Sequence, residues 1–223
     1  MIFNEDSRVK IPAILHLMRL GYEYIPLKDQ NRIEENNIFP SIFIAQISKI
    51  NAISEDEAER VLDEINLELD YEDLGKKFHE RLTATSGIKL IDFENFKNNT
   101  FHVTTELTCK AGDEEFRPDI TILINGLPLA FIEVKKPHNK QGVIAERKRI
   151  NTRFKNKYFR RFVNISQLLI FSNNMEYEDG IVEPIFGAFY ATPSYEQVSF
   201  NYFREDLDYP VKQSLLPLSE DFE

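Results

Sequence analysis

Three charged side chains near the middle of the chain have the types and spacing of a hydrolytic site. Residues 116–137, FRPDITILINGLPLAFIEVKKP, have the pattern of two apolar strands joined by a tight connection. Asp119 opens the first strand, and the second carries Glu133 and Lys135. Successive side chains of a strand point to opposite faces, so Glu133 and Lys135 share one face. A hairpin would bring Asp119 level with them.

The connection between these strands decides whether the two carboxylates meet. A two-residue turn at Asn125 and Gly126 would pair Asp119 with the residue before Glu133. The carboxylates would then lie on opposite faces. We therefore expect a three-residue loop over 125–127, with Gly126 or a neighbour in a special conformation, or else a bulge that restores the register.

Two carboxylates and a lysine on one strand face suit metal-assisted hydrolysis. Carboxylates are hard oxygen ligands for Mg²⁺, which usually keeps several waters. Such an ion makes water a usable nucleophile near neutral pH and offsets charge on a phosphoryl transition state. A lysine beside it can orient or deprotonate the water. The pattern Pro-Asp, gap, Glu-x-Lys is short, and ordinary charges at strand ends are the alternative interpretation.

Longer motifs surround these three residues. They are Asp-x-x-Asn-x-x-x-Asn-x-Phe (Asp92, Asn95, Asn99, Phe101), Arg-Pro-Asp (117–119), Asn-Gly-x-Pro-Leu (125–129) and Ile-Glu-x-Lys-x-Pro (132–137). With them, residues 90–137 closely resemble the nuclease domain of the restriction subunit (HsdR) of type I restriction-modification enzymes. Leu20-Gly21-Tyr22 and Asn173-Asn174 extend the resemblance, less densely, over most of residues 5–190.

This resemblance implies the α/β fold called PD-(D/E)xK, or restriction-endonuclease-like. We expect a mixed central sheet with the hairpin in its middle, flanked by helices, behind a helical amino-terminal portion. The resemblance assigns metal ligation to Asp119 and Glu133 and the catalytic lysine to Lys135. It implies Mg²⁺-dependent endonucleolytic hydrolysis of double-stranded DNA, with a separate specificity subunit choosing the target.

The chain departs from the family in two respects. Many relatives carry Gln-x-x-x-Tyr on the helix after the second catalytic strand, and residues 143–161 contain no such spacing. Many enzymes of this fold also use an acid from an early helix. Glu5, Asp6 and Glu80 are candidates, and we take Glu80 as the candidate third metal ligand.

The charge of the chain is unevenly distributed. The formal net charge is −10, yet residues 134–161 hold eleven of the 27 Lys and Arg residues and one of the 37 acids. Phosphate contact is the natural use of such a segment, and a solvated helix face is the alternative. The predicted DNA-binding residues are Lys136, Lys140, Arg147, Lys148, Arg149, Arg153, Lys155 and Lys157.

Hydrophobic periodicity and turn residues outline the elements. We expect helices over 11–20, 39–50, 54–69, 71–85 and 143–162, with a capping box at Ser54 and Glu57. We expect strands over 88–92, 101–109, 167–172 and 181–192, besides the central hairpin. We expect residues 23–38 to form a loop.

These elements predict one endonuclease domain over 1–192, mainly helical to 87 and carrying the catalytic sheet and basic helix from 88. The resemblance to type I restriction subunits implies that residues 193–223 are an extension or linker toward an ATP-driven motor in a longer parent chain. The sequence has no Walker phosphate loop, so ATP would be a cofactor of that parent and not of these residues. The partners that the resemblance implies are double-stranded DNA and the methyltransferase and specificity subunits.

Cysteine usage and hydropathy set the expected environment. The single cysteine, Cys109, excludes a disulfide framework and favours a reducing compartment. The sequence shows neither a signal peptide nor an apolar run of membrane-spanning length, so we expect a cytoplasmic protein that does not bind membranes.

Two other functions remain open. One is a different nuclease of the same fold, such as a stand-alone enzyme. The other is a catalytically inert, nuclease-like module that docks DNA, a motor or a methyltransferase partner. An intact set of Asp, Glu and Lys argues against the second, because a buried carboxylate pair without a metal is costly to keep.

Overall fold

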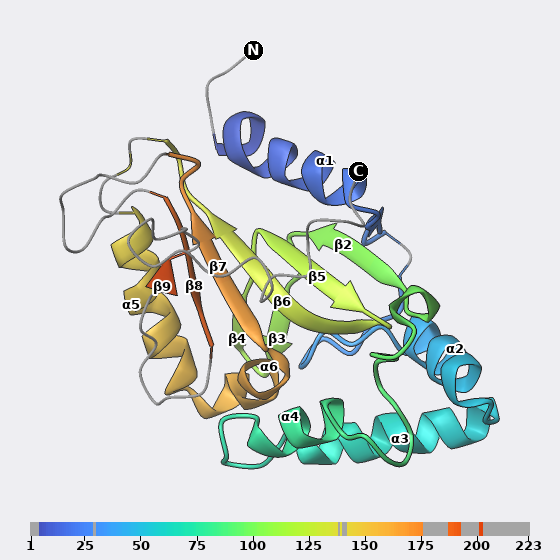
Figure 1. The fold of residues 1–223 in the computed structure, drawn as a ribbon. Helices are drawn as coiled ribbons and strands as arrows, with labels where there is room; N and C mark the ends of the chain where they lie inside the picture. Colours follow the sequence, from blue (N-terminus) through green and yellow to red (C-terminus); the bar gives the residue numbers. More distant parts are fainter. Residues whose placement is uncertain are drawn as a thin grey trace, which may run out of the picture.

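The computed structural model describes residues 5–28, 30–137, 139, 142–175, 187–192 and 201–202, and these form a mixed α/β fold (Figure 1). The helical elements are η1 (Asp6–Lys10), α1 (Ile11–Arg19), α2 (Pro40–Asn51), α3 (Glu55–Glu68), α4 (Lys76–Leu82), η2 (Phe96–Asn98), α5 (Gly142–Phe154), η3 (Lys157–Phe159) and α6 (Arg160–Ile165). The strands are β1 (Glu23–Tyr24), β2 (Phe101–Thr105), β3 (Cys109–Ala111), β4 (Glu114–Phe116), β5 (Ile120–Ile124), β6 (Leu127–Val134), β7 (Leu168–Ser172), β8 (Ala188–Ala191) and β9 (Asn201–Tyr202).

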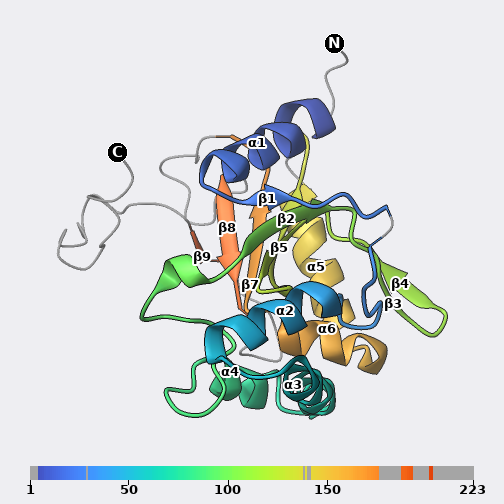
Figure 2. The same ribbon diagram turned by 90° about the vertical axis from the view of Figure 1, so that its right-hand side faces the viewer.

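One mixed sheet organises the described residues. Its strand order is β1-β2-β5-β6-β7-β8-β9, so the β5–β6 hairpin lies in its middle. The β1–β2 and β6–β7 pairs are parallel, and the other pairs are antiparallel. The β3–β4 hairpin forms a separate ribbon that projects from the body (Figure 2). The predicted mixed sheet with a central hairpin is therefore confirmed.

Helices cover both faces of the sheet near β6. On one face, Phe131 and Phe171 pack with α5 and α6 residues such as Ile150 and Phe162. Val134, which points to the opposite face, packs with residues of η1, α1 and β2. The α1 helix lies across one end of the sheet, and α3 and α4 lie at the other end (Figures 1 and 2).

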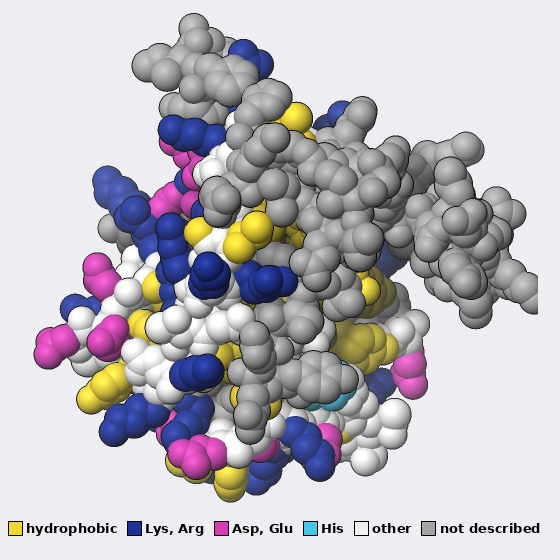
Figure 3. Space-filling view, turned by 90° about the vertical axis from the view of Figure 1, so that its left-hand side faces the viewer, with side chains coloured by type: hydrophobic (Ala, Val, Ile, Leu, Met, Phe, Trp, Pro, Cys, Tyr) yellow, Lys and Arg dark blue, Asp and Glu magenta, His cyan; other side chains and the backbone are white. Residues whose placement is uncertain are grey.

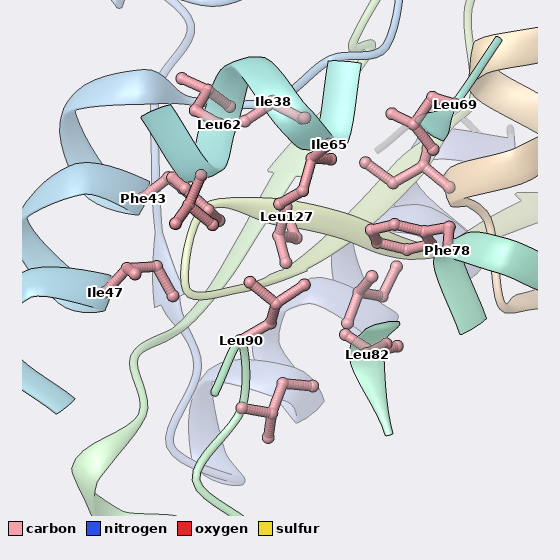
Figure 4. Packing of buried hydrophobic residues seen from close by; sticks show 14 of the residues in the cluster. Ile38, Phe43, Ile47, Leu62, Ile65, Leu69, Phe78, Leu82, Leu90 and Leu127 are labelled. Atoms are coloured by element: carbon pink, nitrogen blue, oxygen red, sulfur yellow. The ribbon is translucent and has the colours of Figure 1, made fainter. Parts of the chain in front are cut away.

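The end of the sheet next to α3 and α4 contains the largest apolar cluster. Leu127, at the start of β6, is fully buried among side chains of α2, α3 and α4 (Figure 4). The capping box predicted for α3 is present, since Glu57 N donates to Ser54 Oγ at 3.2 Å and Ser54 N donates to Glu57 Oε2 at 3.0 Å. This cluster anchors the start of β6, leaving its far end free to carry polar groups.

The β5–β6 turn differs from the three-residue loop that we expected. Ile124 pairs with Leu127 across a two-residue turn, in which Asn125 and Gly126 have φ of 51° and 80°. The register then shifts: Leu123 pairs with Pro128, whereas Ile122 pairs with Ala130. The three-residue loop is therefore wrong, and the alternative that we named, a bulge that restores the register, is confirmed.

Side-chain and backbone contacts hold both the turn and the bulge. The buried amide of Asn125 accepts from Thr100 N at 2.8 Å and donates to Leu90 O at 2.8 Å. Leu129, the extra residue of the bulge, is buried in the cluster beside α3, and its carbonyl accepts from Gln167 N at 2.7 Å. The polar backbone groups at the irregularity thus have partners, as burial requires.

Several predicted element boundaries are wrong. Residues 88–92 form no strand, because the Asn51 side chain bonds both backbone groups of Lys89 and Asn125 takes the carbonyl of Leu90. The strand predicted over 101–109 stops at Thr105, because Glu106 has a φ of 56°. Two residues of the predicted loop form β1.

Two helices are shorter than predicted. The helix expected over 71–85 covers only Lys76–Leu82, after Gly75 at a φ of 79°. The helix expected over 143–162 is broken where Asn156 caps a new turn by accepting from Tyr158 N. The strand over 181–192 is described only as β8, and most of 193–223 lies outside the described residues.

The space around Gly126 generates a test of the turn. A Cβ atom at this position would lie 2.8 Å from Phe43 N and 2.9 Å from Phe39 O, and these are backbone atoms that cannot move aside independently. We expect Gly126→Ala to lower the free energy of unfolding by about 2 to 4 kcal/mol, from overlap combined with strain at positive φ. Denaturant unfolding of the chain measures the loss.

Gly112→Ala is the matched control. Gly112 also has a positive φ, of 64°, but nothing lies within 4 Å of the added Cβ. We expect a loss of about 1 kcal/mol from backbone conformation alone. Equal losses in the two variants would contradict close packing of α2 against the turn.

Candidate functional site

The predicted catalytic residues meet at the end of the β5–β6 hairpin. Ile120 pairs with Ile132, so the next residues, Asp119 and Glu133, lie opposite one another and share a face. Asp119 is fixed by the amide of Val134, which donates to its Oδ2 atom at 2.9 Å. The bulge thus brings together the two carboxylates that the plain turn would have separated.

Glu133 is a buried carboxyl in an anionic environment. Its side chain is 8% exposed. Burial raises its pKa to about 8, with the neighbouring carboxylates of Glu146 and Asp119 adding to the rise and Lys135 opposing it. The site therefore favours either a proton on Glu133 or a nearby cation.

Lys135 lies between two carboxylates. Its Nζ atom is 3.5 Å from Glu133 Oε2 and 3.4 Å from Glu146 Oε2, and the side chain is 15% exposed. Burial disfavours the charged ammonium, but the attraction of Glu133, Glu146 and Asp119 outweighs it and raises the pKa of Lys135. The lysine is thus held as a cation beside the carboxylate pair.

The start of the chain supplies a further acid and a second lysine. The half-buried carboxyl of Glu5 has a raised pKa, chiefly from burial, and interacts with Lys135, Asp119 and the backbone of Lys136. Lys10 Nζ lies 3.5 Å from Asp119 Oδ1. Glu5, which we considered as an early-helix acid, therefore faces the site.

Glu106 and Arg117 extend this charge network, although neither was predicted as a site residue from the sequence. Lys10 donates to Glu106, whose other oxygen lies 2.6 Å from Arg117 Nε. Glu106 adopts a φ of 56°, uncommon for a residue other than glycine, and its amide bonds the carbonyl of Asp119. The arginine of the Arg-Pro-Asp motif was the available signal, because it adjoins Asp119.

Glu80 does not join the site. Its side chain is 64% exposed on α4, 3.9 Å from Lys76. The α4 helix packs with Leu127 at the start of β6, and Glu133 lies six residues further along, about 20 Å at the rise of a strand. The structure therefore does not support Glu80 as the third acid, because its helix packs at the other end of the sheet.

Two carboxylates of the described residues, Asp119 and Glu133, are the candidate ligands for a cation. Among the described side chains, no three His, Cys, Asp or Glu residues form a ready-made metal cluster. Asp119 and Glu133 still offer oxygen atoms on one face, and the raised pKa of Glu133 reflects unfavourable negative charge that a cation would relieve. The donor set fits Mg²⁺, which is commonly held by one or two carboxylates with water and phosphate.

The basic segment follows the site directly. Of its predicted DNA contacts, Lys136, Lys148, Lys155 and Lys157 are exposed, and Lys140 lies outside the described residues. Lys and Arg side chains are spread across the face of the molecule seen from the side of α5 (Figure 3).

The arginines of the basic segment differ from one another in exposure and in the groups that they contact. Arg149 Nη1 and Arg153 Nη1 lie 2.7 Å and 3.3 Å from Glu146. Arg153 also stacks its guanidinium over the Phe116 ring, 4.4 Å from the centroid, and its side chain is only 22% exposed. Arg153 is thus a less accessible phosphate contact than Arg149.

A family comparison identifies the chain. Residues 2–178 match the model of the type I restriction enzyme R protein N terminus. The chain belongs to this family, which confirms the resemblance found in its motifs.

Named relatives agree with this assignment. The chain is 30% identical over 202 residues to a putative type I restriction enzyme MjaIXP endonuclease subunit of Methanocaldococcus jannaschii, covering 79% of this chain and 19% of the relative. It is 27% identical over 185 residues to the type I restriction enzyme SauCOLORF180P endonuclease subunit of Staphylococcus aureus, with the same two coverages. The chain thus spans about a fifth of the length of these relatives.

None of the helices in the described ranges combines the length and the apolar character needed to cross a bilayer. The cytoplasmic location and the division at residue 192 stay predictions.

The raised pKa of Glu133 predicts pH-dependent stability without metal. A carboxyl whose pKa rises from 4.5 unfolded to about 8 folded contributes stability that is complete below pH 4.5 and is lost as the pH rises through about 8. We expect the melting temperature of the metal-free chain to fall across this window, and to fall less in Glu133→Gln. Calorimetric scans of both proteins over the window test this.

Added Mg²⁺ provides the complementary observation. It should raise the melting temperature most at the upper end of the window, because a cation binds the deprotonated carboxyl. Parallel pH profiles for wild type and Glu133→Gln would show that Glu133 does not titrate in this environment.

Proposed function

We propose that this chain is the nuclease part of a type I restriction enzyme and has the PD-(D/E)xK fold. Its reaction would be Mg²⁺-dependent hydrolysis of phosphodiester bonds in double-stranded DNA. The observation that carries the proposal is the convergence of Asp119, Glu133 and Lys135 at the bulged hairpin. Family membership and the names of the relatives, which are endonuclease subunits, support the same reaction class.

Each residue has a separate role in the proposed reaction. Asp119 and Glu133 would hold Mg²⁺, with Glu5 as a further acid that faces the site. When bound, the ion supplies positive charge that lowers the pKa of water and offsets charge on the phosphate. Lys135, held as a cation by two carboxylates, would orient the attacking water and stabilise the charge that develops on the phosphate oxygens.

The basic segment would hold the DNA backbone. Lys136 directly follows the catalytic strand and Lys148 lies on the next helix, α5, so a duplex lying on these two exposed lysines would pass the site. Backbone contacts carry no base sequence directly, and we therefore assign target choice to another subunit. ATP-driven translocation and assembly with methyltransferase and specificity subunits belong to our proposal for the whole restriction enzyme.

Lys135→Ala tests the catalytic role. In the assembled restriction enzyme that contains this chain, we expect DNA cutting to fall about 100-fold or more, because a positioned charge at the reacting phosphate is lost. ATP hydrolysis should persist. Both are measured on the same preparation, by cleavage of plasmid DNA and by phosphate release.

Lys76→Ala serves as the control for Lys135→Ala. Lys76 is 77% exposed on α4, at the far end of the sheet, so its removal should leave cutting unchanged. If Lys135→Ala cuts DNA as wild type does, the nuclease proposal is wrong, and a docking module for DNA or a partner subunit takes its place.

Lys148→Ala tests the backbone contact. We expect DNA binding to weaken to a similar degree for all sequences, and the slope of log affinity against log salt to decrease by about 1. Fluorescence anisotropy at several salt concentrations measures both. Lys49→Ala, at an exposed position near the end of α2, should leave the slope unchanged. An unchanged slope for Lys148→Ala would remove this lysine from the interface.

A further inference from the structure

Glu146 is the one acid of the basic segment, and it is almost completely buried. Its side chain is 1% exposed. The cations around it come from α5 and from Lys135, the residue that directly follows β6. Its Oε1 atom faces Arg153 at 3.3 Å. Its Oε2 atom faces two cations at once, Arg149 at 2.7 Å and Lys135 at 3.4 Å.

This shared oxygen fixes the distance between the predicted catalytic lysine and an arginine of the basic helix. The contacts of 2.7 Å and 3.4 Å limit the separation of Arg149 Nη1 and Lys135 Nζ to about 6 Å. A single phosphate group, with oxygens on several sides, can bridge two cations at this separation. Glu146 thus does more than offset the positive charge of α5, because it links Arg149 on that helix to Lys135 at the end of β6.

The three cations differ in how far they can reach a ligand. Arg149 is 60% exposed, so its remaining N–H groups are open to an anion. Arg153 is 22% exposed and lies against the Phe116 ring, so it is less accessible to a ligand than Arg149. Lys135 is 15% exposed at the edge of the carboxylate pair. Arg149 and Lys135 are therefore the pair that one phosphate could reach.

We propose that Glu146 is a positioning residue that holds Lys135 and Arg149 together, and that Arg149 contacts the same phosphate as Lys135. This inference rests on the proposed nuclease function. It gives a role to Glu146, which the sequence left without one, and assigns the predicted DNA contact of Arg149 to one particular phosphate. A buried carboxylate needs such partners, so loss of its charge frees both cations from their fixed positions. Misplacement of a catalytic group by a small distance lowers the rate strongly.

Two substitutions in the assembled restriction enzyme test this inference. Glu146→Gln keeps the size of the side chain and removes its charge, and Arg149→Gln removes the exposed cation. We expect each to lower the cutting rate at saturating DNA about tenfold or more, with DNA affinity within about threefold of wild type. The double variant should be no slower than the slower single variant, because both changes disable one unit.

The control is Glu68→Gln. Glu68 is also a poorly exposed glutamate near an arginine, 14% exposed and 3.9 Å from Arg81, but it lies on α3 at the opposite end of the sheet. Its substitution should leave cutting at the wild-type rate. ATP hydrolysis, measured in every variant, reports whether the enzyme is assembled.

The outcomes separate this inference from the function on which it rests. If Lys135→Ala stops cutting while Glu146→Gln and Arg149→Gln cut at the wild-type rate, the nuclease function stands and the positioning role fails. If Arg149→Gln weakens affinity without slowing cutting at saturating DNA, Arg149 is an ordinary backbone contact and the inference also fails. Losses that multiply in the double variant would likewise overturn it. Arg149 is exposed, so its variant decides the question even if Glu146→Gln does not fold.

Discussion

The position of one extra residue in β6 determines what this hairpin can do. The turn at Asn125 and Gly126 is tight, clamped by buried amide contacts and by close approach of the α2 backbone. Continued regularly, that turn would direct Asp119 and Glu133 to opposite faces. The bulge at Leu129 shifts the register by one residue, and the buried Leu129 side chain and a bond from Gln167 hold it. The hairpin thus combines a rigid turn with a shared carboxylate face.

Electrostatics make that shared face chemically distinctive. Asp119, Glu133 and Glu146 gather negative charge where water has little access, which is why the pKa of Glu133 rises. Lys10, near the start of the chain, and Lys135, near its middle, contact these carboxylates. Such a cluster of buried charges is a poor way to stabilise the fold, since apolar side chains could fill the same space at a lower desolvation cost. Its location at the end of the central strands, beside a cationic helix, is understandable if a cation and a phosphate complete the charge balance.

Sequence alone predicted the parts of the molecule whose signals are local. Two short apolar runs joined by a tight connection marked the hairpin, and Ser54 with Glu57 marked the start of α3, because both signals depend on a few neighbouring residues. The alternation of side chains along a strand also showed that a regular two-residue turn would put Asp119 and Glu133 on opposite faces. The choice between a longer loop and a bulge depended on contacts with Leu90 and Gln167, far along the chain. For the same reason Glu80 was preferred over Glu5, and the contact of Glu146 with Lys135 was missed.

A crystal structure with Mn²⁺ would test the central claim most directly. Mn²⁺ accepts the same oxygen ligands as Mg²⁺ and can be located by its anomalous scattering. If the bulge exists to build a cation site, a peak should lie within bonding distance of carboxylate oxygens of both Asp119 and Glu133, and it should be absent in Asp119→Ala. Mn²⁺ bound elsewhere, or a peak unchanged in Asp119→Ala, would contradict the claim that the shared face holds a metal.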